Sequence, residues 1–252
     1  MWLAENGDCH YNGDKPVAKG EFCSVKYDVV LFDADDTLLD FGKSEAVALQ
    51  QAFDMFALPL TDEIRAGYLE INHGLWKALE RGEIDKPHVL AHRFQDTFAR
   101  FGIVGPADGS FEREYQRLLG EGAYLVDGAV DVLNALKADC RLAIVTNGVT
   151  ATQTNRLRLS GLDQIIGDVF ISEQVGVAKP QKAFFDAVFA ALGEPERSRV
   201  LIVGDSLTSD MRGGEAAGID SCWYNPMGKP NDTGVRITYE IADLAELLKI
   251  IK

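Results

Sequence analysis

Strand-like and helix-like segments alternate along the second half of this 252-residue chain. Short apolar runs rich in β-branched residues, such as RLAIVTNG and RVLIVGDS, are separated by amphipathic stretches such as KAFFDAVFAALG. Nearly continuous apolar runs are typical of strands buried on both faces, and helices that connect such strands make them parallel. The connections are almost always right-handed. The alternation therefore predicts an α/β fold with a doubly wound, Rossmann-like parallel sheet.

The first strand of this sheet is predicted early in the chain, at 25–32, and a different pattern then interrupts the alternation. Across 43–124 the apolar residues recur at spacings of three and four without a strand-like run, which indicates amphipathic helices. We therefore predict a core built from 25–42 and 125–252, with an all-helical insertion at 43–124. Residues 1–24 are polar and lack an apolar period, so we expect a mobile tail there.

The charge of the chain limits its partners. A formal net charge of −14 argues against a nucleic-acid polymer or an anionic membrane. A small anionic substrate remains compatible, because a lysine, a helix N-terminus or a metal can supply local positive charge. No apolar run approaches the roughly 20 residues of a membrane span, and the N-terminus does not resemble a signal peptide. The four cysteines are scattered, so we expect a cytoplasmic protein with reduced thiols.

Polar clusters follow three of the predicted strands. The first strand ends in DADDT, the second in TNG and the fourth in GDS, and the loop after the third strand carries VGVAKP. In open parallel sheets, ligands bind beyond the carboxyl ends of the strands. These four segments are therefore expected to converge on one crevice.

Two carboxylates of the first cluster suit a divalent cation. Asp33 and Asp35 lie two residues apart in an extended segment, so their side chains should face the same way, and Asp205 could add a third oxygen. Mg²⁺ prefers oxygen ligands and would offset the cost of crowding these charges at the edge of a core. A calcium-binding loop would need Gly and Glu where the chain has Leu38 and Ser44. An ordinary solvated acidic turn is the remaining alternative.

The four segments, taken in order, resemble the motifs of the haloacid dehalogenase superfamily of phosphohydrolases. FDADDT (32–37) is similar to the nucleophile motif, VTNG (145–148) to the second motif, Lys179 in VAKP to the third, and VGDSLTSD (203–210) to the acidic fourth. The resemblance runs from about residue 26 to the end. It implies an α/β core with a helical cap inserted after the first motif.

The resemblance also implies a mechanism. Asp33 would attack phosphorus and form an aspartyl-phosphate, and Asp35 would act as general acid and then as general base. Mg²⁺ would be bound by Asp33, by the backbone carbonyl of Asp35 and by Asp205, and Asp210 would support either the waters on the metal or Lys179. Lys179 would neutralise both Asp33 and the transferring phosphoryl group.

Two further points follow from the same resemblance. The substrate phosphate would be bound by the second motif, through Thr146, Asn147 and Gly148, together with Lys179. Superfamily members that cleave carbon–halogen or carbon–phosphorus bonds typically lack an acid at the position of Asp35. Its presence therefore favours transfer from an oxygen leaving group.

A finer resemblance concerns the insertion. Asn72 and Trp76 in N-x-x-x-W, the following RGEI, and VTNGVTATQTNRLRLSGL are most similar to the bacterial pyrimidine 5′-nucleotidase branch. Specificity would then depend on Asn72, Trp76 and Arg81. The alternatives are a Trp76 packed in the core of the insertion, a solvated Asn72, and an Arg81 that only ends a helix. The histidines of this region show no partner pattern and are expected at the surface: His73, His88 and His92.

The leading hypothesis is a Mg²⁺-dependent phosphatase of small phosphorylated metabolites, in particular nucleoside 5′-monophosphates. A sugar-phosphate phosphatase, a phosphoglycolate phosphatase and a phosphosugar mutase are alternatives within the same enzyme class. A non-catalytic binding protein is less consistent with the sequence, because it would not need Asp33 and Asp35 together. Either a monomer or a homodimer is expected.

Overall fold

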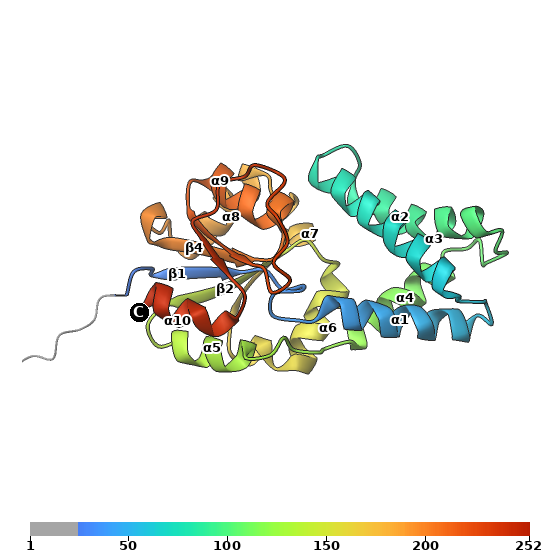
Figure 1. The fold of residues 1–252 in the computed structure, drawn as a ribbon, viewed down its shortest axis with the longest axis horizontal. Coiled ribbons are helices and arrows are strands. Elements are labelled where there is room, and N and C mark those ends of the chain that lie inside the picture. Colours follow the sequence, from blue (N-terminus) through green and yellow to red (C-terminus); the bar gives the residue numbers. More distant parts are fainter. Residues whose placement is uncertain (1–24) are drawn as a thin grey trace, which may run out of the picture.

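A parallel sheet lies at the centre of the core. The computed structural model describes residues 25–252, so the predicted tail, 1–24, lies outside the described residues. All strands of the sheet are parallel, in the order β3-β2-β1-β4-β5-β6, which confirms the predicted doubly wound α/β fold (Figure 1). Its strands are β1 (Val29–Phe32), β2 (Arg141–Thr146), β3 (Asp168–Ile171), β4 (Val200–Gly204), β5 (Asp220–Tyr224) and β6 (Tyr239–Ile241). The three-residue β6 was not predicted, and β1 begins at Val29 rather than at the predicted residue 25.

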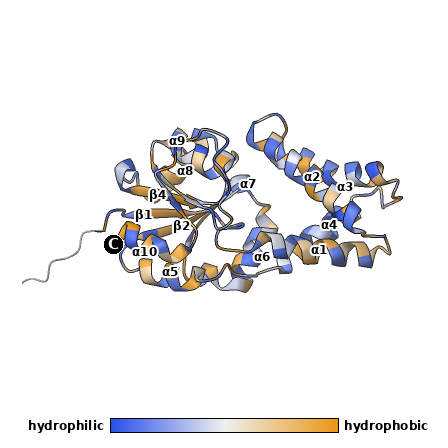
Figure 2. Cartoon of the chain, in the orientation of Figure 1, coloured by the Kyte–Doolittle hydropathy of each residue, from blue (hydrophilic) through white to orange (hydrophobic). Residues whose placement is uncertain are grey.

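Side chains of β1 alternate between the two faces of the sheet. Val30 and Phe32 belong to one buried apolar cluster, whereas Val29 and Leu31 belong to the other. Helices α5 and α10 cover the first face, and α8 and α9 cover the second (Figure 1). Because both faces are covered, the central strands β1 and β4 carry no charged or polar side chain (Figure 2). These helices are α5 (Ala129–Leu136), α8 (Lys182–Leu192), α9 (Arg212–Ala217) and α10 (Leu247–Ile251).

Helices follow one another without a strand between β1 and β2. They are α1 (Phe41–Met55), α2 (Asp62–Glu80), α3 (Lys86–Phe101) and α4 (Ser110–Glu121). Side-chain caps fix three of their starts, because Asp40, Thr61 and Asp85 each accept a hydrogen bond from a backbone N–H of the first turn. Helix α1 already begins at Phe41, so the predicted boundary between 42 and 43 falls within its first turn.

The inserted helices have an apolar core of their own, rich in aromatic rings. Phe53 and Phe111 pack edge to face at 5.2 Å, and Tyr68 stacks on Phe94 at 5.0 Å. Such pairs add to the stabilisation from buried area alone. None of the described helices is both long and apolar enough to cross a membrane.

The insertion contacts the core where α4 packs on α6 (Thr150–Ser160). The other short helical elements lie in loops of the core: η1 (Leu162–Gln164), α7 (Ser172–Val175), η2 (Arg197–Arg199), η3 (Leu207–Met211) and η4 (Leu244–Glu246). As predicted, the polar segments all follow carboxyl ends of strands. Residues after β1, β2 and β4, and the loop between α7 and α8, therefore meet at one edge of the sheet.

Candidate active site

A buried lysine lies at the centre of this edge. The Nζ atom of Lys179 donates hydrogen bonds to Asp33 Oδ1 at 2.6 Å, to Asp210 Oδ1 at 2.7 Å and to the carbonyl oxygen of Val145 at 2.7 Å. Only 1% of the Lys179 surface is exposed. A buried ammonium group is tolerated only when it is paired and fully hydrogen-bonded, and these three acceptors meet that need.

Asn147 fixes the backbone of Lys179. Its side-chain amide accepts a hydrogen bond from Lys179 N and donates one to Lys179 O, both at 2.9 Å. In this structure, then, the residue expected at the phosphate ties the second motif to the third. The contact explains why the loop between α7 and α8 presents its lysine at this point.

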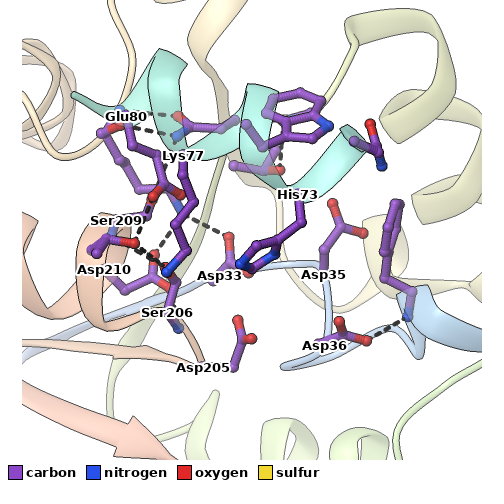
Figure 3. Close-up of a pocket in the computed structure, with 18 of the residues that line it drawn as sticks. Asp33, Asp35, Asp36, His73, Lys77, Glu80, Asp205, Ser206, Ser209 and Asp210 are labelled. Carbon is purple, nitrogen blue, oxygen red and sulfur yellow. Dashed lines mark hydrogen bonds and ion pairs between the residues drawn. The ribbon is translucent and has the colours of Figure 1, made fainter. Parts of the chain in front are cut away.

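Three carboxylates gather beside the lysine. Oxygen atoms of Asp33, Asp205 and Asp210 lie within 4.8 Å of one another, and Figure 3 shows them on one side of the cavity. Gly204 makes room for this arrangement, since a Cβ atom there would lie 2.3 Å from Asp210 Oδ2. Asp210 was expected to support the metal waters or Lys179, and here its carboxylate pairs with Lys179 and also lies within the acidic group.

The acidic group carries a strong electrostatic penalty. Burial raises the pKa of Asp33 to about 8, although the Lys179 ammonium acts in the opposite direction, and repulsion from Asp210 raises it further. Burial and the charge of Asp33 also raise the pKa of Asp205 well above its usual value. A divalent cation among these oxygens would remove the penalty. The donor set is composed of hard oxygen atoms, and it therefore fits Mg²⁺.

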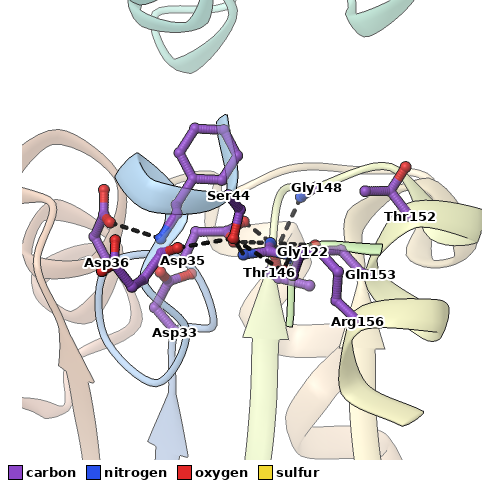
Figure 4. A network of polar contacts seen from close by, with 12 residues as sticks. Asp33, Asp35, Asp36, Ser44, Gly122, Thr146, Gly148, Thr152, Gln153 and Arg156 are labelled. Carbon is purple, nitrogen blue, oxygen red and sulfur yellow. Dashed lines mark hydrogen bonds and ion pairs between the residues drawn. The ribbon is translucent and has the colours of Figure 1, made fainter. Parts of the chain in front are cut away.

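Asp35 is not part of this acidic group and belongs to a second polar network (Figure 4). Gln153 Nε2 donates to Asp35 Oδ2 at 2.9 Å and to Thr146 Oγ1 at 3.0 Å, and Arg156 Nη1 donates to Asp35 Oδ1. Gly148 N donates to Thr146 Oγ1 at 3.1 Å, and a Cβ atom at Gly148 would lie 2.5 Å from Gln153. The network therefore joins the first and second motifs.

A cavity of about 930 Å³ lies over both networks. Helix α2 crosses above the carboxylates, with His73, Lys77 and Glu80 reaching down from it (Figure 3). His73 is exposed, as expected, yet it lines the cavity. Partial desolvation of the ring at the cavity and the charge of the nearby Lys77 lower the pKa of His73.

The three predicted specificity residues have different surroundings. Trp76 is half-buried, lines the cavity and lies outside the aromatic core of the insertion. Asn72 is buried and also lines the cavity, with Nδ2 donating to Glu45 Oε1 at 2.9 Å and Oδ1 lacking a partner among residues 25–252. Arg81 is exposed, pairs with Glu83 at 2.6 Å and is not brought to the cavity.

Two residues of the insertion form hydrogen bonds with the core, and neither was predicted from the sequence. Lys86 Nζ donates to the carbonyl oxygen of Gly148 and to Ser172 Oγ, both at 2.8 Å. Glu80 accepts a hydrogen bond from Thr208 Oγ1 at 2.5 Å. The first contact lies beside the second motif and the second beside the fourth motif.

A parallel α/β core with these four motifs at its strand ends, under a helical insertion, defines a class of hydrolases. A family model described as haloacid dehalogenase-like hydrolase matches residues 27–218. The chain belongs to this haloacid dehalogenase-like hydrolase family.

Among the relatives that match nearly the whole chain, three are at least 34% identical to it. It is 44% identical over 227 residues to the HAD-hydrolase YfnB of Bacillus subtilis, covering 90% of this chain and 96% of YfnB. It is 39% identical over 224 residues to the pyrimidine 5′-nucleotidase PynA of Streptococcus pneumoniae, with coverage of 88% and 94%. It is 34% identical over 227 residues to the pyrimidine 5′-nucleotidase YjjG of Escherichia coli, with coverage of 90% and 99%.

A crystal structure of YfnB from Bacillus subtilis, described as bound to magnesium and as revealing interdomain movement, has the same fold. Its TM-score is 0.84 at 45% sequence identity, covering 89% of this chain and 98% of that chain. A 2-haloacid dehalogenase from Pseudomonas syringae shares the fold at 24% identity, with a TM-score of 0.64 and coverage of 89% and 97%.

Proposed function

We propose that this hydrolase is a Mg²⁺-dependent phosphatase that forms an aspartyl-phosphate on Asp33 and acts on pyrimidine nucleoside 5′-monophosphates. The observation that carries the chemistry is the buried ammonium of Lys179 between Asp33 and Asp210, with the Asp35 carboxylate in the adjoining network. The two pyrimidine 5′-nucleotidases among the relatives support the substrate class.

The proposed reaction has two transfers. An oxygen of the Asp33 carboxylate forms a bond to phosphorus, and the bond from phosphorus to the nucleoside 5′-oxygen breaks while Asp35 donates a proton to that oxygen. Asp35 then removes a proton from water, whose oxygen bonds to phosphorus as the bond to Asp33 breaks. Inorganic phosphate leaves, and both carboxyl groups return to their starting protonation states.

Lys179 favours the charged form of the Asp33 carboxylate and attracts the phosphoryl oxygens, because its ammonium group is buried where charges interact strongly. The Asp33, Asp205 and Asp210 carboxylates, together with the backbone carbonyl of Asp35, are the groups that would hold Mg²⁺. When bound, the cation neutralises charge on the phosphoryl oxygens. Thr146 and the backbone of the second motif would orient the phosphate.

The size and lining of the cavity suit a nucleotide. Its volume of about 930 Å³ is much larger than a phosphate group requires and is in the range of small-molecule sites. Trp76 offers an aromatic face, and the Asn72 amide and the Glu45 carboxyl offer hydrogen-bonding groups.

A phosphate-release screen tests the substrate class. Pyrimidine nucleoside 5′-monophosphates should give a higher kcat/KM than purine nucleotides, hexose phosphates and phosphoglycolate. Preference for phosphoglycolate or a sugar phosphate would overturn the nucleotidase assignment. Hydrolysis in ¹⁸O-labelled water should put one solvent oxygen into the released phosphate, whereas a mutase would return the phosphoryl group to a sugar.

Metal removal is expected to silence the enzyme. Excess chelator should reduce phosphate release to background and added Mg²⁺ should restore it, because the acidic group would then lack its counter-charge. Asp205→Ala should require more Mg²⁺ for half-maximal rate or lose activity altogether. A titration of rate against free Mg²⁺ measures both effects, and full activity in chelator would contradict the metal assignment.

Trp76→Ala is expected to weaken nucleotide binding without unfolding the protein. Loss of stacking worth roughly 1–3 kcal/mol should raise KM for UMP about 5- to 150-fold. Trp76→Phe keeps an aromatic face and serves as the matched control, and p-nitrophenyl phosphate is a substrate without a nucleobase. A melting temperature that falls together with the rates on both substrates would instead show that Trp76 supports the packing of the insertion.

A further inference from the structure

We propose that Arg156 is a positioning residue that holds the acid–base carboxylate of Asp35 and makes its orientation depend on the two connections between core and helical insertion. The proposal rests on the role of Asp35 in the proposed function. Arg156 lies in α6, and it has no direct contact with the substrate in the reaction described above.

The Arg156 guanidinium is enclosed by acceptors from several segments. Its side chain has 0% exposure, and Nη1 donates to Asp35 Oδ1 and, at 2.9 Å, to Gln153 Oε1. Nε donates to the carbonyl oxygen of Gly122 at 2.9 Å, and Nη2 lies 3.4 Å from Ser44 Oγ. Placing a guanidinium in the interior is costly unless it is paired, and Asp35 is the carboxylate that pairs with it. Figure 4 shows the group between α6 and the loop after β1.

Both carboxylate oxygens of Asp35 accept hydrogen bonds from side chains of α6. Arg156 contacts Oδ1, and Gln153 donates to Oδ2 at 2.9 Å. A single hydrogen bond would let the carboxyl plane rotate, whereas two donors on different oxygens fix it. The Asp35 side chain is 26% exposed, so it keeps access to the cavity while Arg156 has none. Each carboxylate oxygen retains a lone pair for proton transfer.

The remaining Arg156 contacts lie at the two ends of the insertion. Ser44 is in the first turn of α1, and Gly122 directly follows α4. Ser44 Oγ donates to the carbonyl oxygen of Gly122 at 2.9 Å, and a Cβ atom at Gly122 would lie 2.7 Å from Ser44 Cβ. The two connections are thus closely packed against each other, and one guanidinium contacts both.

This shared contact has a mechanistic consequence. A shift of either connection would remove acceptors from Arg156 and loosen its hold on Asp35. Proton transfer would then be efficient only with the insertion placed as in this structure. Phosphate binding, which depends on other residues, would be affected much less.

Leaving-group dependence tests the proposal. The first turnover of Arg156→Lys should be slower than wild type on UMP by about 10- to 100-fold, because a misplaced acid protonates the 5′-oxygen poorly. The first burst of p-nitrophenolate from p-nitrophenyl phosphate should stay within about threefold, since that leaving group needs little protonation. KM for UMP should hardly change. Arg100→Lys, at an exposed arginine paired with Glu70, is the matched control and should behave as wild type.

An equal loss on both substrates, or no loss, would overturn the proposal and leave Arg156 as a purely structural residue. If Arg156→Lys does not fold, Ser44→Ala takes its place, and a drop of at least about twofold in the UMP rate relative to p-nitrophenyl phosphate is expected. An unchanged ratio would then contradict the proposal. The Asp35→Asn variant distinguishes a wrong role for Arg156 from a wrong role for Asp35. If Asp35→Asn slows the reaction of UMP and of p-nitrophenyl phosphate equally, Asp35 is not the general acid and the proposed function itself fails.

Discussion

Asp33→Asn is expected to reduce phosphate release by roughly 10⁴- to 10⁶-fold, the scale of loss seen when a covalent nucleophile is removed. The amide has nearly the shape of the carboxylate, but it cannot form the acyl phosphate. The amide also keeps a hydrogen-bonding oxygen for Lys179, which lies 2.6 Å from Asp33 Oδ1. The fold should therefore survive, and circular dichroism together with the melting temperature checks this.

Asp35→Asn is the informative companion of that variant. It removes the proton carrier but leaves the nucleophile, so the loss should be smaller, about 10²- to 10⁴-fold. A folded Asp33→Asn protein that turns over at a rate near wild type would eliminate the covalent scheme. The order of the two losses, measured with the same substrate and metal concentration, is therefore as informative as their size.

Lys179→Met should abolish activity and destabilise the protein as well. It leaves the buried carboxylates of Asp33 and Asp210 side by side without their shared counter-charge. Removing one partner of a buried ion pair typically costs about 3–5 kcal/mol. Urea unfolding of the metal-free protein measures the change, and phosphate release measures the activity.

Lys182→Met provides the control for that prediction. Lys182 lies three residues further on and pairs with Asp186 at 2.6 Å, but its side chain is 59% exposed. Exposed pairs contribute little, so the change should stay within about 1 kcal/mol. Equal unfolding free energies for the two variants would contradict the claim that the buried ion pairs of Lys179 with Asp33 and Asp210 stabilise the fold more than an exposed pair does.

The sequence was sufficient to predict the core and the convergence of its motifs, for a physical reason. Apolar runs long enough to define strands end in Asp33, Thr146 and Asp205, and parallel strands bring their carboxyl ends to one edge. Lys179 joins them because it lies in a loop at the same edge. The three residues of β6 were too short to show a period, so that strand was missed.

Residues whose environment depends on tertiary packing could not be predicted in the same way. Gln153 and Arg156 lie three residues apart on one face of α6, a spacing that looks like a polar, solvated face in the sequence. Only the packing of α4 and the loop after β1 against α6 buries them. Lys86 likewise reads as an ordinary helix start until α3 meets the second motif. Arg81 was singled out, but its own helix end and Glu83 suffice to explain it.

The most direct test of the account is to trap the phosphoryl group on Asp33. In Asp35→Asn, p-nitrophenyl phosphate should still phosphorylate Asp33, because its leaving group needs little protonation, while hydrolysis stalls without a general base. Rapid mixing should then give a burst of about one p-nitrophenolate per active site, and mass spectrometry after acid quench should find phosphate on the peptide that contains Asp33. Linear release without a burst, or phosphate on a different residue, would contradict the central claim that Asp33 carries the phosphoryl group.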